Sequence, residues 1–258
     1  MGAKARSLIG TIYMGLLDAN KQLVGGYKQV GNVYPFKIKV ETDQKGQTSR
    51  MKETAGQTLD AVTRLKTNGI TGSLDIHQWI PETLAWALMG EAVALTAGSG
   101  AVDVGTPESV TAVLDEFVRL AHGDVSSVVV KDDTDTTTYV AGTDYEVNAA
   151  LGMIKALSTG DISDDDVLHV SYSYAAETGY QVNIGTKSLI RVAVLIDGED
   201  EFTGEACKAE FYSVVLASGT EIGVISEPEN DHEVLSFSTI FETPSGKSTP
   251  GTINGLPL

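Results

Sequence analysis

Cysteine is almost absent from this chain, because Cys207 is the only one in 258 residues. No disulfide can therefore form within the chain, which suits a protein folded in a reducing compartment. The single thiol has two interpretations, a nucleophile or a packed residue of a sheet. Its position in an apolar, strand-like stretch beside Lys208 favours packing.

Metal and nucleotide motifs are also lacking. The sequence contains no CxxC or HExxH, and its four histidines lie far apart. Gly25-Gly26 belongs to no GxxxxGK[ST] or GxGxxG pattern, and no GxSxG occurs. We therefore predict no metal, no cofactor and no enzymatic activity. The histidines are His77, His122, His169 and His232.

Long apolar runs and an excess of basic residues are missing too. No stretch reaches the 18 or more apolar residues of a membrane-spanning helix, so we predict no membrane anchor. The chain has 18 Lys and Arg against 35 Asp and Glu, a formal net charge of −17. Such a surface repels nucleic acid rather than holding it. The hydrophobic content of 42% is nevertheless enough to bury a core.

The negative charge is unevenly distributed. Residues 98–180 hold 15 acidic and 3 basic residues, a net charge of −12, whereas residues 1–97 hold 8 and 11, a net charge of +3. The small residues Thr96–Ala101 open the acidic segment, and Glu177–Gly179 close it. A shift in composition between small residues predicts an inserted domain, 98–180, within a domain made of 1–97 and 181–258.

Apolar and polar residues alternate along most of the chain, which predicts a mainly β fold. The signal Asn68-Gly69 predicts a hairpin between Leu59–Lys66 and Ile70–Trp79. The polar stretches Asp43–Gln57 and Asp197–Asp200 are predicted to connect strands. Other expected strands are Leu8–Leu17, Val33–Thr42, Leu189–Ile196, Ala209–Leu216 and Val234–Phe241, and in the insert Val125–Lys131, Thr137–Val140, Tyr145–Val147 and Val167–Tyr174.

One short helix is expected after Pro81, since proline is tolerated in a first turn and Gly90 offers a stop. Trp79 and Trp86 lie around this helix and have two interpretations, sugar-stacking aromatics or packing in a core or subunit interface. Packing is favoured for both, together with Leu84 of the apolar helix face.

Two segments of the insert remain ambiguous. Glu108–His122 fits a helix or an interrupted strand, and its valines and threonine favour the strand. Asp164–Asp166 and the acidic turn Asp132–Asp135 fit either calcium ligands or solvated turns. The spacing of a calcium-binding loop is missing, which favours turns.

The order of the expected elements resembles that of the tail tube (major tail) proteins of tailed bacteriophages. The resemblance covers residues 1–97 and 181–243, roughly two thirds of the chain. It rests on pattern and order, and none of its motifs is catalytic. The elements that carry it are the strand Leu8–Leu17, the alternating Val33–Thr42, the polar loop Asp43–Gln57, the hairpin at Asn68-Gly69, the helix at Pro81 and the strands between Leu189 and Phe241.

The middle segment resembles the immunoglobulin-like β modules often inserted in phage virion proteins. Tyr139–Val147 includes a Gly-Thr-Asp-Tyr turn, Gly152 begins a second turn, and Val167–Tyr174 follows. The cysteine pair of antibody domains is missing, so only the broad sandwich architecture is implied. The expected fold is a tail-tube-type β-sandwich or barrel with one short helix, plus an inserted β-sandwich.

The resemblance implies a structural subunit of the virion tail, assembled in the cytoplasm of the bacterial host. Six subunits would form a ring, and rings would stack into a tube through whose lumen DNA is ejected without specific binding. Its other partners would be tape measure, baseplate or terminator proteins and, in a contractile tail, a sheath. The alternative is a surface adhesin or carbohydrate-binding β protein of the virion. Contractile and non-contractile tails both stay open.

The polar loop Asp43–Gln57 is the expected contact between rings. Fifteen residues is long for a hairpin connection, and nothing in the loop would fold onto a core in a free subunit. The resemblance implies that it reaches an adjacent ring, and the alternative is a surface loop without a role. The expected contact residues are Lys45, Arg50, Met51, Lys52 and Glu53.

Overall fold

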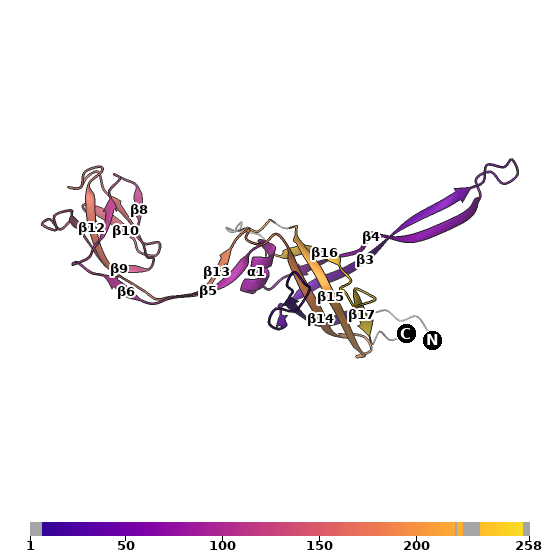
Figure 1. Ribbon diagram of the computed structural model, residues 1–258. Helices are drawn as coiled ribbons and strands as arrows, with labels where there is room; N and C mark the ends of the chain where they lie inside the picture. The colour runs from indigo at the N-terminus through magenta and orange to yellow at the C-terminus, as the bar shows by residue number, and fades with distance from the viewer. Residues whose placement is uncertain (1–6, 220, 224–232, 255–258) are drawn as a thin grey trace. The chain divides into compact units, whose positions relative to one another are not determined.

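The chain divides into two compact units, each with a core of its own (Figure 1). The computed structural model describes residues 7–219, 221–223 and 233–254. Unit 1 is Met1–Val93 with Val182–Leu258, and unit 2 is Ala94–Gln181. The expected mainly β class is confirmed, because the described residues form seventeen strands and one helix.

Unit 1 is built on one antiparallel sheet of eight strands. The sheet runs in the order β2-β1-β14-β15-β16-β4-β3, and β17 pairs with β15 beside the end of β16. The strands are β1 (Leu8–Leu16), β2 (Lys28–Gln29), β3 (Val33–Thr48), β4 (Thr58–Ile76), β14 (Ile190–Asp200), β15 (Ala206–Ser218), β16 (Leu235–Phe241) and β17 (Gly251–Asn254).

The core of unit 1 follows from strand alternation. On β16, Leu235, Phe237, Thr239 and Phe241 are buried, and the residues between them are not. Side chains of successive strand residues point to opposite faces, so this alternation places every second residue in the core. The alternation expected for Val234–Phe241 is confirmed. Met14, Leu74, Val192, Val194, Val214 and Leu216 complete the centre of the cluster.

The sheet of unit 1 does not close into a barrel. β3 ends the strand order on one side, and no described strand pairs with its outer edge. The segment between β2 and β3 connects the β1 side of the sheet to the β3–β4 side. In this segment the Val30 N–H donates to the Ile12 carbonyl of β1, and the Asn32 carbonyl accepts the N–H of His77, which follows β4. The barrel half of the expected fold is therefore wrong for the described residues, and the sheet keeps two free edges.

Two connections expected within unit 1 are strand instead. Asp43–Thr48 belong to β3, since Asp43 pairs with Arg64 and Gly46 with Ala61. The expected loop therefore shrinks to residues 49–57. Asp197–Asp200 likewise belong to β14, where all four pair with β1 and Asp197 to Glu199 also pair with β15. Polar side chains indicate exposure, but the backbone of both segments still pairs with neighbouring strands.

The hairpin expected at Asn68-Gly69 is also wrong, because both predicted strands belong to β4. Val40 pairs with Ile70 and Thr42 with Leu65, so residues 66–69 bulge out of β4 opposite a single β3 residue. A Cβ on Gly69 would lie 2.7 Å from the carbonyl oxygens of Glu41 and Lys66. Glycine is therefore required at the bulge by a close backbone approach.

The expected helix forms as α1 (Pro81–Ala87), with Pro81 in its first turn. The Thr83 hydroxyl donates to the Ile80 carbonyl and accepts the Ile80 N–H, which fixes the start of the helix. At its end, Gly90 donates its N–H to Ala85. The helix packs on β15 and β16, and it buries Thr83, Ala85, Trp86 and Ala87.

Unit 2 is a sandwich of two antiparallel sheets around its own core. In one sheet β12 pairs with β9 along its length, with β7 at its start and with β6 at its end. The second sheet has the order β10-β11-β8. The helical alternative for Glu108–His122 is wrong, since this segment holds two short strands. The strands are β6 (Gly100–Val102), β7 (Glu108–Thr111), β8 (Phe117–Arg119), β9 (Val125–Asp132), β10 (Tyr145–Asn148), β11 (Met153–Ala156) and β12 (Val167–Tyr174).

The turn before β10 is held by one carboxylate. Asp144 is buried and accepts the N–H groups of Val140, at 2.7 Å, and of Asp161, at 3.0 Å. Gly142 has φ +83°, which only glycine adopts without strain. A further two-stranded sheet, β5 (Glu91–Ala97) with β13 (Glu177–Asn183), carries the chain between the units.

Candidate assembly surface

The free edges of the unit 1 sheet border an apolar cleft. β1 pairs with β14 along its length, but on its other side only Tyr13 and Met14 pair with β2. From Leu8 to Thr11, no strand among the described residues lies on that side. The free edge of β3 is the other border. Unpaired N–H and C=O groups along a strand are a template for another strand.

The cleft has a volume of about 530 Å³ and no charged side chain in its wall. This is unusual in a chain with 21% charged residues. Apolar surface exposed in a soluble protein commonly marks an interaction site. The wall consists of Leu8, Ile9, Gly10, Ile12, Val33, Tyr34, Pro35, Phe36, Ile38, Ile196, Gly198, Cys207, Ala209, Phe211 and Ile253.

Cys207 lines this cleft, and His77 packs behind one of its lining residues, Tyr34. Cys207 is buried on β15, opposite Gly198 of β14. The His77 ring stacks on Tyr34, with centroids 3.9 Å apart, and its Nε2 lies 2.8 Å from the Tyr34 carbonyl oxygen. The histidine thereby holds a cleft-lining tyrosine in place.

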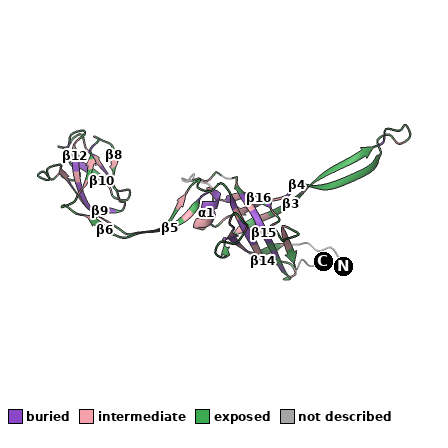
Figure 2. Ribbon diagram, in the orientation of Figure 1, coloured by how far each residue is buried: buried purple, intermediate pink, exposed green. Residues whose placement is uncertain are grey.

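The hairpin β3–β4 continues past the region where β4 also pairs with β16. β16 contacts β4 only from Thr71 to Ile76, so the part of β4 from Thr58 to Ile70 pairs with no described strand other than β3. Figure 2 shows this outer part almost entirely in the colour of exposed residues. We call residues 42–48 with 58–65 the ribbon. A ribbon of two strands without a core has little stability of its own in water.

The two faces of the hairpin differ sharply in chemistry. Paired residues share a face, so the face of the buried Leu74 and its partner Phe36 continues outward through Ile38 and Val40. None of its members is charged, and we call it the uncharged face. On the ribbon it carries Thr42, Gln44, Gly46 and Thr48 of β3 with Leu59, Ala61, Thr63 and Leu65 of β4.

The opposite face is the charged face. Asp43 and Arg64 are directly paired across it, and the Lys39 ammonium lies 2.7 Å from Glu41. The Lys39 hydrogen bond and the nearby Lys39 and Lys66 charges lower the pKa of Glu41. Lys66 also lies 3.8 Å from Asp43. These exposed pairs keep the charged face in contact with water.

The hairpin differs in charge from the remainder of the chain. Residues 33–76 hold 7 basic and 5 acidic residues, a net charge of +2, so the other residues hold 11 and 30, a net charge of −19. A basic element on an acidic chain is attracted to the acidic surface of another copy, an effect that salt weakens.

The structure separates the predicted inter-ring residues. Lys45 lies on β3, paired with Val62, whereas Arg50, Met51, Lys52 and Glu53 lie in the tip between the strands. The hydrogen bonds of the buried Ser49 hold the tip in a defined conformation. The Ser49 N–H donates to Gln57, its carbonyl accepts the Gly56 N–H, and its hydroxyl lies 2.7 Å from that of Thr54.

The predicted packing residues lie in different environments. Trp86 on α1 is 8% exposed and belongs to the core, and Leu84 packs against that core. Trp79 precedes the helix and is 38% exposed. An ion pair between Lys28 of β2 and Glu82 ties the helix to the sheet. The sequence alone does not predict Leu59 and Leu65 of the ribbon as surface-forming residues, because Asn68-Gly69 predicts a turn where β4 in fact continues.

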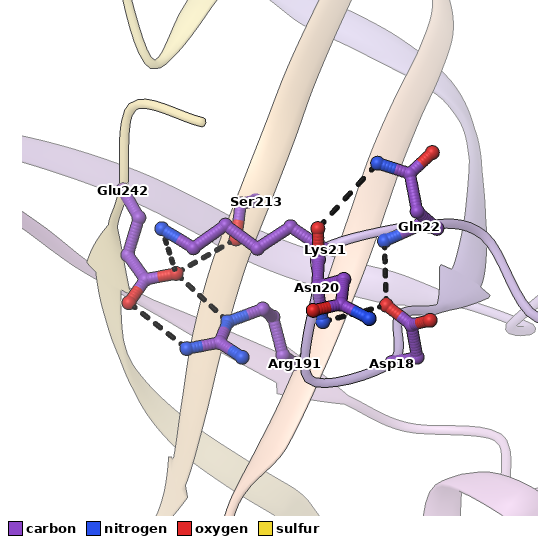
Figure 3. Close-up of polar contacts among 7 residues, drawn as sticks. All are labelled: Asp18, Asn20, Lys21, Gln22, Arg191, Ser213 and Glu242. Atoms are coloured by element: carbon purple, nitrogen blue, oxygen red, sulfur yellow. Dashed lines mark hydrogen bonds and ion pairs between the residues drawn. The ribbon is translucent and has the colours of Figure 1, made fainter. Parts of the chain in front are cut away.

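A polar cluster anchors the turn that leads into β2 (Figure 3). Glu242 accepts two hydrogen bonds from Arg191, at 2.8 and 3.2 Å, one from Ser213 at 2.9 Å, and pairs with Lys21 at 3.1 Å. Burial alone would raise the pKa of Glu242, but the hydrogen bonds from Arg191, Lys21 and Ser213 outweigh it and lower the pKa to about 2. In the same turn, Asp18 accepts the N–H groups of Asn20 and Gln22.

Unit 2 satisfies its polar groups internally. The Tyr172 hydroxyl donates to Glu108 and lies 3.0 Å from His122 Nδ1, while the His122 ring stacks on Tyr174. Burial, followed by the bond to Glu108, raises the pKa of Tyr172. These four side chains form a packed cluster within the sandwich.

The acidic segments of unit 2 form hydrogen-bonded turns. Asp164 accepts the Leu114 N–H, and Asp132 accepts the Thr137 N–H and two threonine hydroxyls. His169 Nδ1 lies 3.1 Å from Asp135. In the part of the chain that the structure describes, no three His, Cys, Asp or Glu side chains are placed to share a metal ion. His232 lies outside the described residues.

One known family model matches residues of both units. Residues 6–242 match the model of a family described as "Protein of unknown function UCP028589". A search of curated proteins gave no match. Among the described residues, no helix is both long enough and apolar enough to cross a membrane.

Proposed function

The chain belongs to the family "Protein of unknown function UCP028589", whose description assigns no activity, and we propose from the structure that it is a structural subunit of a bacteriophage tail tube. Copies assemble into six-membered rings, and the rings stack around a lumen through which DNA passes. The protein works by assembly in the virion tail, without catalysis. Its other partners are the proteins that measure, start and end the tube.

One observation carries this proposal, the uncharged cleft between two free strand edges in unit 1. A strand from a second copy would satisfy the free backbone groups of β1 or β3 and cover the apolar wall in one step. Because the donating and accepting edges differ, the contact runs head to tail, and a head-to-tail contact forms a ring when the rotation between successive copies closes.

Negative-stain electron microscopy of the purified full chain tests the proposal, since it predicts rings or tubes. A protein that stays monomeric at high concentration would contradict it. If that monomer bound glycans tightly, the virion adhesin would replace the tube subunit as the function. Neither result depends on which residues make the contact.

A matched pair of variants then locates the interface. Ile253→Glu places a charge in the cleft wall, on the face of its partner Ala209, whereas Ile240→Glu places one on the exposed face of β16, outside the cleft. Both isoleucines are exposed, so both variants should fold. We expect Ile253→Glu to abolish rings and Ile240→Glu to leave them intact. Equal assembly by the two variants would remove the cleft from the proposal.

A further inference from the structure

We propose that the uncharged face of the ribbon is a second docking surface for another copy of this chain, and that the charged face stays in water. This inference rests on the proposed function in one respect, that the partner is another copy. The ribbon lies beyond the cleft, and its uncharged face continues from Phe36 and Ile38 of the cleft wall.

The first argument is the continuity of the hairpin's faces. Phe36 and Leu74 pack into the core of unit 1, and the same face then runs outward without cover through Ile38 and Val40. The pattern of a core-facing surface therefore persists for the whole ribbon. A free ribbon would have no reason to keep charge off one face only, because both faces would meet water.

The second argument is the spacing of the large apolar residues on the ribbon. Leu65 pairs with Thr42, and Leu59 is the extra residue of a bulge opposite Thr48. Between them on the same face lie Thr63 and Ala61 and, on β3, Gln44 and Gly46. Two exposed leucines with uncharged residues between them form a strip that another surface can cover without removing a charge from water.

The third argument identifies the partner by charge. The hairpin has a net charge of +2 and the remainder of the chain −19. Two hairpins therefore repel one another weakly, whereas a hairpin is drawn toward the body of another copy. The uncharged face then supplies the contact, since apolar contact needs no charge to be removed from water.

The test compares the two faces of one ribbon. Leu59→Asp with Leu65→Asp charges the uncharged face, and Val62→Asp charges the opposite face, where Val62 pairs with Lys45. The three side chains have similar exposed fractions, 57%, 56% and 44%. None contributes to the core clusters, so both variants should retain the parent's melting temperature.

The readouts are the assembled fraction in sedimentation and the backbone amide exchange of residues 42–48. Buried charge opposes docking strongly, so we expect the double variant to need a concentration at least about tenfold higher to assemble. Val62→Asp should assemble as the parent does. In the parent, exchange at residues 42–48 should slow on assembly, because docking stabilises a ribbon that has no core.

Each outcome decides the inference separately from the proposed function. If rings or tubes form but the double variant and Val62→Asp assemble alike, the ribbon inference is overturned and the tube proposal stands. Self-association into other forms that only the double variant loses would support the ribbon inference and contradict the tube. A parent that never self-associates overturns both. Should the double variant melt early, Leu59→Thr with Leu65→Thr, which keeps strand-compatible residues, replaces it with the same expectation.

Discussion

Unit 1 and unit 2 are both antiparallel β structures, but they differ in net charge and in exposed apolar surface. Unit 2 packs two sheets against each other, and its 15 acidic residues against 3 basic ones keep it in water. Unit 1 leaves a sheet open, lines the opening with apolar side chains and extends a ribbon whose face has no cover. Most of the negative charge therefore lies in unit 2, and the exposed apolar surfaces that we propose for assembly lie in unit 1.

The largest expected effect is a loss of stability in unit 1 that leaves unit 2 unchanged. Trp86→Ala should destabilise unit 1 by about 3–5 kcal/mol, because the residue is buried against the sheet. Both tryptophans lie in unit 1, so the fluorescence of Trp79 reports unfolding of that unit alone.

Trp79→Ala is the matched control, since this side chain is 38% exposed and should cost only about 1 kcal/mol. Unit 2 should unfold at the same temperature in both variants by circular dichroism. Equal destabilisation by the two substitutions would mean that α1 does not complete the core.

The Glu242 cluster should make unit 1 sensitive to acid. The folded pKa of about 2 lies below the unfolded value of about 4.3, so the cluster stabilises the folded state above about pH 4.3 and loses that effect as the pH falls toward 2. Glu242→Gln should cost about 1–3 kcal/mol at neutral pH. It should also flatten the fall of the unit 1 melting temperature between about pH 4.5 and 2. Parallel pH profiles for parent and variant would contradict this account of the cluster.

The basic residues of the hairpin should contribute a smaller, salt-dependent effect on assembly. Lys45→Glu, Arg50→Glu and Lys52→Glu together change the hairpin's net charge from +2 to −4. Each exposed contact is worth only about 0–1 kcal/mol, although repetition around a ring adds to the effect. We expect shorter tubes, and salt should shorten the parent's tubes in the same way.

The control for charge is reversal of Arg119, Lys131 and Lys155 in unit 2, which changes the total charge equally. If both triple variants form tubes of the parent's length, the hairpin charges have no role. If both shorten the tubes equally, only total charge matters.

The smallest expected effect is that of removing unit 2. Replacing residues 98–176 with a Gly/Ser turn joins the paired strands β5 and β13 and reduces the net charge from −17 to −6. Unit 1 should fold and still assemble, at a somewhat lower concentration because repulsion is reduced. A folded but monomeric product, judged by circular dichroism and sedimentation, would assign assembly to unit 2 instead.

The sequence alone predicts those features of this fold that depend on local pattern. The alternation in Val234–Phe241 correctly predicts strand β16, and Pro81 correctly predicts the start of α1. Both signals depend only on neighbouring residues, through the side-chain period of a strand and the geometry of a first helical turn. The bulge at residues 66–69 was read as a turn, because a close backbone approach and a turn both demand glycine. Only the register of β3 against β4 separates the two.

The candidate surface was harder to predict for the same reason. Polar composition led to a loop at Asp43–Gln57, whereas the ladder runs to Thr48. Once the register is known, Leu59 and Leu65 fall on the face of the core residues. The cleft depends on where a sheet of distant strands fails to close, and no local signal in β1 or β3 encodes that failure.

Backbone amide exchange of the full chain, measured before and after self-association, tests the central claim most directly. The account predicts that protection appears at Leu8–Thr11 of β1, along β3 and in the ribbon, while the amides of β6 to β12 in unit 2 exchange at unchanged rates. Protection confined to unit 2, with the β1 and β3 edges exchanging as fast as in the free protein, would contradict it.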